Sequence, residues 1–149
     1  MNRRLFLTTA ALFLGIVLSQ PTLAENSTKI PGYTIHHNAI TTDFLTPEVA
    51  AAYSLRRSKN RGMLNVSIVK EVPGTTGKSV TAKVKVKATD LLGKTQEITM
   101  RDIRESDAIY YIGEFPVANG TKLYFDIEVT PEGADRSYTA KLIQEFFVD

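Results

Sequence analysis

The residues best suited to proton transfer or metal binding are His36 and His37, which are the only histidines in the chain. A histidine can serve as a general base or as a metal ligand near neutral pH. The two lie in an alternating run that predicts a strand, and adjacent strand residues point to opposite faces, so the pair cannot chelate one metal ion. His36 shares its face with Asn38, and these two side chains could line a small polar binding pocket.

Other catalytic chemistry finds little support in the sequence. The chain has no cysteine, which excludes thiolate nucleophiles, thiolate metal sites and disulfides. A Gly-x-Ser-x-Gly elbow is missing, so a serine hydrolase is not indicated. The 16 Asp and Glu residues always offer carboxylate pairs, and nothing in their spacing selects one. We therefore expect no catalytic residue, no metal ligand and no cofactor.

A charged segment provides a second candidate binding region. Five charged residues lie within Arg101–Asp107, close to the aromatic pair Tyr110 and Tyr111. The segment is expected to be a solvated loop between two strands, with internal ion pairs; it could instead form a recognition patch, or it could pack against the helix end at Arg56 and Arg57. The candidate residues for binding a ligand or partner in this part of the chain are Arg57, Ser58, Arg104, Glu105, Asp107 and Tyr110.

Three lysines form a ladder on one face of the clearest predicted strand. Lys83, Lys85 and Lys87 alternate with apolar residues and repeat at roughly 6.6 Å. Such a row could attract anionic envelope polymers, but it more often keeps the outer face of a sheet soluble. Asp126 and Glu128 point outward from another predicted strand and are expected to neutralise the ladder.

The elements that must position these residues are mainly strands. Apolar and polar residues alternate in seven short runs separated by turn residues rich in Gly, Pro and Asn. The expected strands are Tyr33–Ile40, Leu64–Val69, Val80–Thr89, Ile98–Met100, Ile109–Phe115, Leu123–Val129 and Tyr138–Phe147. This pattern predicts an all-β fold, a seven-stranded antiparallel immunoglobulin-like sandwich, with a partly open barrel as the rival. Residues 25–31 are expected to be a polar leader.

One short helix is expected after the first strand. Thr46, Pro47 and Glu48 provide a hydroxyl cap, a proline at the first helical position and an acid at the positive end of the helix dipole. Ala50 and the two residues that follow it favour helix formation. The spacing predicts a helix over Pro47–Leu55.

The first 24 residues have the pattern of a cleaved signal peptide. Arg3 and Arg4 precede an apolar run, Leu5–Leu18, that is too short to span a bilayer, and small residues precede a cleavage position before Glu25. The alternative is an uncleaved membrane anchor. The paired arginines resemble a twin-arginine signal, but the strongly apolar run favours the general secretory route. We expect a periplasmic protein with one domain over residues 25–149 and no stable membrane anchor after cleavage.

Charge narrows the class of partner. The chain carries 18 Lys and Arg residues against 16 Asp and Glu residues, and the leader removes Arg3 and Arg4 without removing an acid. The mature domain is therefore expected to be neutral, which argues against nucleic acid as the partner.

Several strings resemble a bacterial domain of unknown function, family 4426. The resemblance covers nearly all of the mature chain and is most specific at Leu45–Ala50 and Ala108–Gly113; further matches occur at Ile35–Ala39, Arg57-Ser58 and Arg101–Asp107. Members of this family are typically small, exported and uncharacterised, so the resemblance implies location and domain extent but no activity. The family usually has His-Tyr-Asn where this chain has His36-His37-Asn38, which implies that His36 is the matching histidine.

Two functions remain in view. The first is a non-enzymatic envelope module that binds a protein, a peptide or a small ligand through a sheet edge or through the patch around Arg57 and Glu105. The second is a small hydrolase or metal-dependent enzyme centred on His36, which requires Asn38 and an acid or serine to converge on the imidazole. The fold alone does not separate them.

Overall fold

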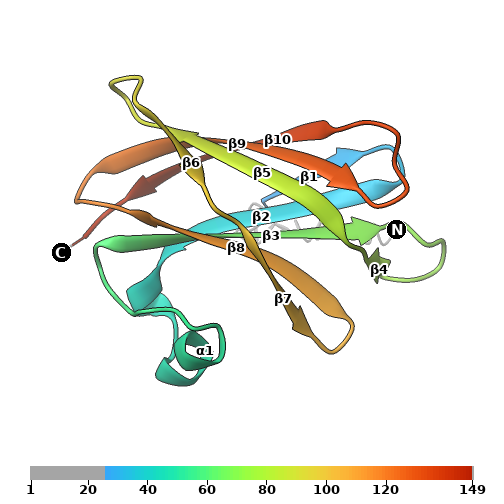
Figure 1. Ribbon diagram of the computed structural model, residues 1–149, viewed down its shortest axis with the longest axis horizontal. Helices are drawn as coiled ribbons and strands as arrows, with labels where there is room; N and C mark the ends of the chain where they lie inside the picture. Colours follow the sequence, from blue (N-terminus) through green and yellow to red (C-terminus); the bar gives the residue numbers. More distant parts are fainter. Residues whose placement is uncertain (1–25, 149) are drawn as a thin grey trace, which may run out of the picture.

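The computed structural model describes residues 26–148, which form two antiparallel sheets with a short α-helix at one corner (Figure 1). The expected signal peptide, residues 1–24, lies outside the described residues, as do Glu25 and Asp149. The expected domain boundaries at residues 25 and 149 therefore stay a prediction.

Sheet A holds six of the described strands and sheet B holds four. Sheet A runs in the order β1 (Ser27–Ile30), β2 (Tyr33–Thr41), β3 (Arg61–Lys70), β8 (Ala108–Pro116) and β7 (Arg101–Glu105), with β4 (Lys78–Ser79) paired to β3. Sheet B runs in the order β10 (Tyr138–Phe146), β9 (Thr121–Pro131), β5 (Ala82–Thr89) and β6 (Thr95–Ile98). The all-β prediction is confirmed.

The main core lies between the two sheets and is built from alternate residues of both. Leu64 and Val66 of sheet A and Phe125 and Ile127 of sheet B are almost completely buried. Phe115 meets Phe125 edge to face, with a centroid distance of 5.3 Å, a geometry that adds about 1 kcal/mol to the burial of the two rings. The alternation expected from the sequence is therefore what builds the core, since inward residues recur at every second position.

The predicted helix is present as α1 (Pro47–Ala52), which follows a three-residue 3-10 turn, η1 (Thr42–Phe44). The Val49 N–H donates to Thr46 Oγ1 at 3.3 Å, as expected of a hydroxyl cap with proline at the first helical position. The helix ends three residues before the expected Leu55. Leu55 itself is buried against sheet A, so its apolar side chain serves packing outside the helix.

Residues 26–148 contain ten strands, so the prediction of seven is wrong. The segment expected to be a polar leader contains β1, because Pro31 and Gly32 turn the chain back and pair Ser27–Ile30 with β2. The expected strand Val80–Thr89 is present as β5 (Ala82–Thr89), but the short strand β4 before it was not expected; the chain leaves sheet A after β4 and enters sheet B at Ala82. Local periodicity does not reveal such a change of sheet.

The third additional strand is β7, which stands where a solvated loop over Arg101–Asp107 is expected from the sequence. Thr99 and Met100 carry the chain from β6 in sheet B to β7 in sheet A, so the run around Ile98 is split between the sheets. This crossover passes directly over β8 at Gly113, where a Cβ atom would lie 2.5 Å from Met100 Sδ and 3.0 Å from the Thr99 carbonyl oxygen. A glycine is therefore required at position 113 by close packing.

Candidate functional site

The helix corner, defined as Thr42–Ser58 together with Arg101–Tyr110, covers part of the outer face of sheet A. Its Ala50 and Leu55 form a second buried cluster with Met63 of β3 and Ile112 of β8. Tyr110, one of the expected binding residues, packs against this cluster and is half-buried. Because these strand residues point away from the main core, the helix is what shields them from water.

Thr42 ties the helix corner to the chain that leaves the helix. Its side chain is fully buried, and Oγ1 donates to the carbonyl oxygens of Arg56, at 2.8 Å, and Ser58, at 3.2 Å. The same oxygen accepts a hydrogen bond from the Ser58 N–H at 2.9 Å. The predicted binding residue Ser58 is thus fixed through its backbone.

Arg57 also binds within the helix corner. Its Nε donates to the Leu45 carbonyl oxygen at 2.7 Å, and one terminal nitrogen donates to the Asp43 carbonyl oxygen at 3.0 Å. These acceptors belong to η1 and to the residue that caps its C-terminal end, where backbone carbonyls need partners. The guanidinium therefore holds the helix entrance in place while remaining exposed to solvent on its other side.

Glu105 joins β7 to the helix. Tyr53 donates its hydroxyl proton to Glu105 Oε2 at 2.7 Å, and this hydrogen bond to the carboxylate is the main reason why the pKa of Tyr53 is raised to about 12. Arg101 donates to the Tyr53 carbonyl oxygen from the same strand. The structure thus brings the charged segment and the helix end together, as the patch hypothesis requires, and the contacts are internal ones.

The remaining expected patch residues lie further out on the same corner. Arg104 pairs with Asp102 at 3.3 Å, and both side chains are largely exposed. Asp107 is exposed in the two-residue turn between β7 and β8, next to Ser106, whose φ is 51°. An exposed ion pair of this kind contributes little to stability. The role of all these residues in recognition stays a prediction.

His36 and Asn38 lie on the outer face of sheet A, away from the helix. They border a polar hollow of about 360 Å³ lined by Asn26, His36, His37, Asn38, Asn65 and Ser67. In the strand register His36 lies opposite Ser67 on one side and Ser27 on the other. Glu71 lines a second shallow hollow that also borders His36. The enzyme hypothesis centred on His36 stays a prediction.

His37 is the more buried histidine, although the resemblance favours His36. Its side chain points to the inner face together with those of Ile35 and Ala39, and Nε2 lies 3.1 Å from Thr28 Oγ1. Burial lowers the pKa of His37 below its ordinary value of 6.5. Nδ1 is buried without a hydrogen-bond partner among residues 26–148. Because a buried imidazole with one partner resists protonation, we assign His37 to the packing of the β1–β2 hairpin.

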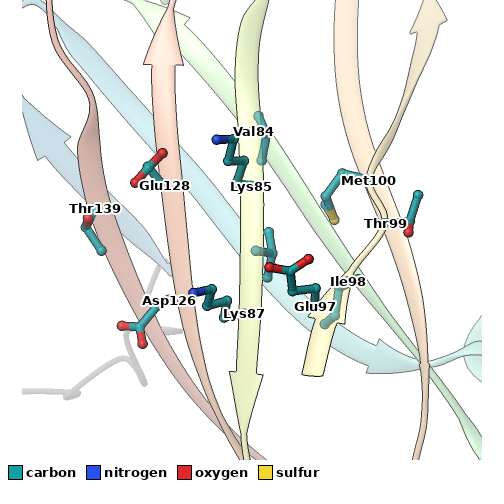
Figure 2. A pocket seen from close by; sticks show the side chains of 11 residues that line it. Val84, Lys85, Lys87, Glu97, Ile98, Thr99, Met100, Asp126, Glu128 and Thr139 are labelled. Atoms are coloured by element: carbon teal, nitrogen blue, oxygen red, sulfur yellow. The ribbon is translucent and has the colours of Figure 1, made fainter. Parts of the chain in front are cut away.

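A larger hollow, the β5 groove, lies where sheet B stops being continuous. It has a volume of about 640 Å³ (Figure 2) and is lined by Val84, Lys85, Val86, Lys87, Glu97, Ile98, Thr99, Met100, Asp126, Glu128 and Thr139. β9 pairs with β5 along Ala82–Thr89, whereas β6 pairs only with Val86–Thr89 before the crossover takes it to sheet A. The first half of β5 is therefore an edge.

The rim of the β5 groove is charged and its floor is apolar. Lys85 lies opposite Glu128 of β9, and Lys87 lies between Asp126 of β9 and Glu97 of β6. These neighbours confirm the expected placement of acids beside the lysine ladder (Figure 2). Val84 and Met100 are half-buried and pack against the main core from the open side. The sequence predicts the lysine face but not the groove, because no local sequence pattern shows that β6 stops pairing with β5 at Val86.

Neither a metal centre nor a membrane span emerges from the described part of the chain. Within residues 26–148, no three His, Cys, Asp or Glu side chains gather closely enough to hold a metal ion. In the same range, no helix is long and apolar enough to cross a bilayer.

Comparisons with known proteins point to a family and a fold. The model of a domain of unknown function, DUF4426, matches residues 27–149. A crystal structure of a DUF4426 family protein from Pseudomonas aeruginosa PAO1 is 33% identical, with a TM-score of 0.70, and the match covers 83% of this chain and 94% of that chain. A search of curated proteins finds no match.

More distant structures share the fold alone. FetP of uropathogenic Escherichia coli strain F11, expressed in the periplasm of E. coli, is 12% identical with a TM-score of 0.57, covering 81% of this chain and 92% of FetP. A copper-bound FetP variant is also 12% identical, with a TM-score of 0.58 and coverage of 83% and 95%.

Proposed function

The chain belongs to the domain family DUF4426, and we propose that it is an exported, non-enzymatic binding module that holds a partner protein in the β5 groove. The observation that carries this proposal is the half-covered β5. Within residues 26–148, β5 has a paired strand on both sides over Val86–Thr89 but on one side only over Ala82–Lys85. A strand edge of this kind accepts an extended segment through backbone hydrogen bonds.

One end strand of sheet A, β7, is less suited to strand addition. It carries Arg101, Asp102, Arg104 and Glu105 within five residues. Charges of both signs on a short strand oppose pairing with another chain. At the β5 edge, by contrast, the half-buried side chains of Val84 and Met100 border the groove. An added strand would therefore bury apolar area and would also form hydrogen bonds with backbone groups of β5.

Two further expectations belong to this proposal. The periplasm is supported by the signal peptide expected at residues 1–24, and FetP, which shares the fold, was expressed in the periplasm. The immunoglobulin-like arrangement is supported by the strand order. If β1 and β4 are left aside, β2-β3-β8-β7 and β10-β9-β5 follow the order A-B-E-D and G-F-C, and β6 is added at the edge.

Copper is not part of the proposal, although a FetP variant binds it. His36 and His37 project to opposite faces of β2, and the described residues offer no cluster of three His, Cys, Asp or Glu side chains. This donor set does not fit a copper centre built on such ligands.

Photo-crosslinking in living cells tests the proposal. A photoreactive residue would replace Thr99, which lines the β5 groove, and, as the matched control, Asp107 in the exposed turn of the helix corner. We expect one protein to be attached at position 99 and not at 107. That adduct should disappear when Val84→Pro is added. Attachment only at position 107 would move the interface to the helix corner, and no attachment at either position would contradict a binding module.

A further inference from the structure

We propose that the β5 groove selects an extended segment in which acidic and apolar residues alternate, added as a strand beside Val84. This inference rests on the proposed function and specifies the partner's chemistry. Its basis is that the protein's own strand β6 places one acid, Glu97, opposite Lys87 and one apolar residue, Ile98, opposite Val86 where it covers the second half of β5. The open first half of β5 lacks that cover within the described chain.

The backbone groups that would receive the segment follow from strand alternation. The Ala82 N–H donates to Tyr111 Oη at 2.8 Å, and the Asp90 N–H donates to the Lys94 carbonyl oxygen across the β5–β6 turn at 3.0 Å. In contrast, the Thr81 carbonyl accepts from the Glu132 N–H on the β9 side. Even-numbered residues of β5 therefore direct their backbone groups away from β9, because these directions alternate along a strand.

Val84 is the even-numbered residue at the centre of the open half. Its N–H and C=O thus face the β5 groove at a position that β6 does not reach. The Ala82 carbonyl faces the same way, whereas the Ala82 N–H is already bound by Tyr111. An incoming strand of about three residues can bond to these groups, and the segment's length is limited by Tyr111 on one side and by β6 on the other.

The side-chain preference follows from the rows of charge across sheet B. Lys87 has an acid on both sides, Asp126 on β9 and Glu97 on β6. Lys85 has one acid, Glu128, on β9 and an open position on the other side (Figure 2). Lys83 lies opposite Thr130. An acidic residue placed beside Lys85, and another beside Lys83, would complete the pattern already present at Lys87.

The position between the two acids calls for an apolar residue. β6 places Ile98 opposite Val86, and Ile98 is buried in the main core. The equivalent position opposite Val84 would lie over Val84 and Met100, which are half-buried and border the groove. The preferred segment is therefore acidic–apolar–acidic, with the apolar residue opposite Val84. A segment with basic residues at the outer positions would meet Lys83 and Lys85 and be disfavoured.

The direct test uses two synthetic peptides and the purified chain. Fluorescent peptides with alternating Glu and Val, or alternating Lys and Val, are titrated and followed by anisotropy. We expect the Glu-Val peptide to bind at least tenfold more tightly than the Lys-Val peptide. Lys85→Glu should reduce this preference by about tenfold, because it replaces attraction by repulsion on one side chain. Lys29→Glu, the same charge change on β1 of the other sheet, should leave it unchanged.

A backbone measurement identifies where the peptide binds. Amide hydrogen exchange of Val84 should slow on addition of the Glu-Val peptide, whereas that of Val86, already covered by β6, should stay unchanged. Val84→Pro, which removes the N–H on the open side, should reduce affinity at least tenfold with the fold retained, since edge positions tolerate proline. Equal binding of both peptides, no binding of either, or binding without slower Val84 exchange would each overturn the inference.

The outcomes separate this inference from the proposed function. A cellular partner crosslinked at position 99 that the Glu-Val peptide does not displace would leave the binding module in place and overturn the acidic–apolar preference. Binding of the peptide without any cellular adduct at position 99 would support the preference and contradict the proposed function.

Discussion

The helix corner and the β5 groove are both polar at their surface, but they differ in what their polar groups contact. In the helix corner, Arg57 binds two backbone carbonyls, Glu105 accepts from Tyr53, and Thr42 closes the loop to Ser58. In the β5 groove, the backbone of Val84 faces a hollow of about 640 Å³, and β6 ends before reaching it. The charged segment Arg101–Asp107 therefore makes hydrogen bonds that hold the fold together, whereas the alternating strand β5 leaves an edge where a partner could bind.

The energetic reason lies in the cost of leaving a polar group without a partner. A buried donor or acceptor without a hydrogen bond costs about 1–3 kcal/mol, more than a formed bond contributes net. Side chains such as Thr42 and Arg57 are therefore expected to matter for stability. No described strand pairs with Val84 on the open side of β5, so its backbone groups are expected to matter for binding.

The crossover that creates the β5 groove gives the largest expected effect. Gly113→Ala would place a Cβ atom 2.5 Å from Met100 Sδ and 3.0 Å from the Thr99 carbonyl oxygen. The crossover would have to move, and we expect a loss of about 3 kcal/mol in the free energy of unfolding, together with weaker binding of the Glu-Val peptide. Urea denaturation and anisotropy measure the two effects. Thr76→Ala, at an exposed position outside the β5 groove, is the control, and unchanged stability of Gly113→Ala would contradict this packing.

Thr42→Val is expected to weaken the helix corner without affecting the groove. The change keeps the shape of the buried side chain but removes the hydroxyl that bonds to Arg56 and Ser58. The loss should be about 2 kcal/mol in the free energy of unfolding, measured by urea denaturation. Thr76→Val, at an exposed position outside the β5 groove, is the control. A loss of peptide binding in Thr42→Val at full stability would show that the two regions are not independent.

Arg57→Ala distinguishes a structural role from a recognition role. Removal of its bonds to Leu45 and Asp43 is expected to lower the free energy of unfolding by about 1 kcal/mol, a small value because the side chain is solvent-exposed. Peptide affinity and the adduct at position 99 should be unchanged. If Arg57→Ala abolished capture of the partner while thermal stability stayed the same, the helix corner would be the interface.

The smallest expected effect is a pH dependence at Tyr53. Its pKa is raised from 10.0 to about 12 by the hydrogen bond to Glu105, so the stability contributed by that bond is fully present below pH 10 and is lost as the pH rises towards 12. We expect the melting temperature of the protein to fall towards that of Tyr53→Phe over this range. Glu105→Gln should bring one tyrosine titration back towards pH 10, which tyrosinate absorbance detects. An unchanged titration would exclude the contact.

Much of the secondary structure could be predicted because it depends on local alternation and capping. The helix start at Thr46 and Pro47 and the lysine face of β5 both follow from residues close together in the sequence. β1, β4 and β7 could not be predicted in the same way, since each is defined by the strand it pairs with. At the candidate site, the lysine face of β5 could be predicted from the sequence, but the open edge of β5 could not, because it depends on where β6 stops pairing.

The sequence by itself determined which residues point inward, where the chain turns and that a short helix begins at Pro47, because side-chain periodicity and turn chemistry act over a few residues. Only the tertiary structure decided that Arg57 and Glu105 bind within the protein, that His37 rather than His36 is the more buried histidine, and that β6 leaves β5 half-covered. These features depend on which distant strands lie side by side. That arrangement is set by burial of the whole core between two sheets, which no single segment encodes.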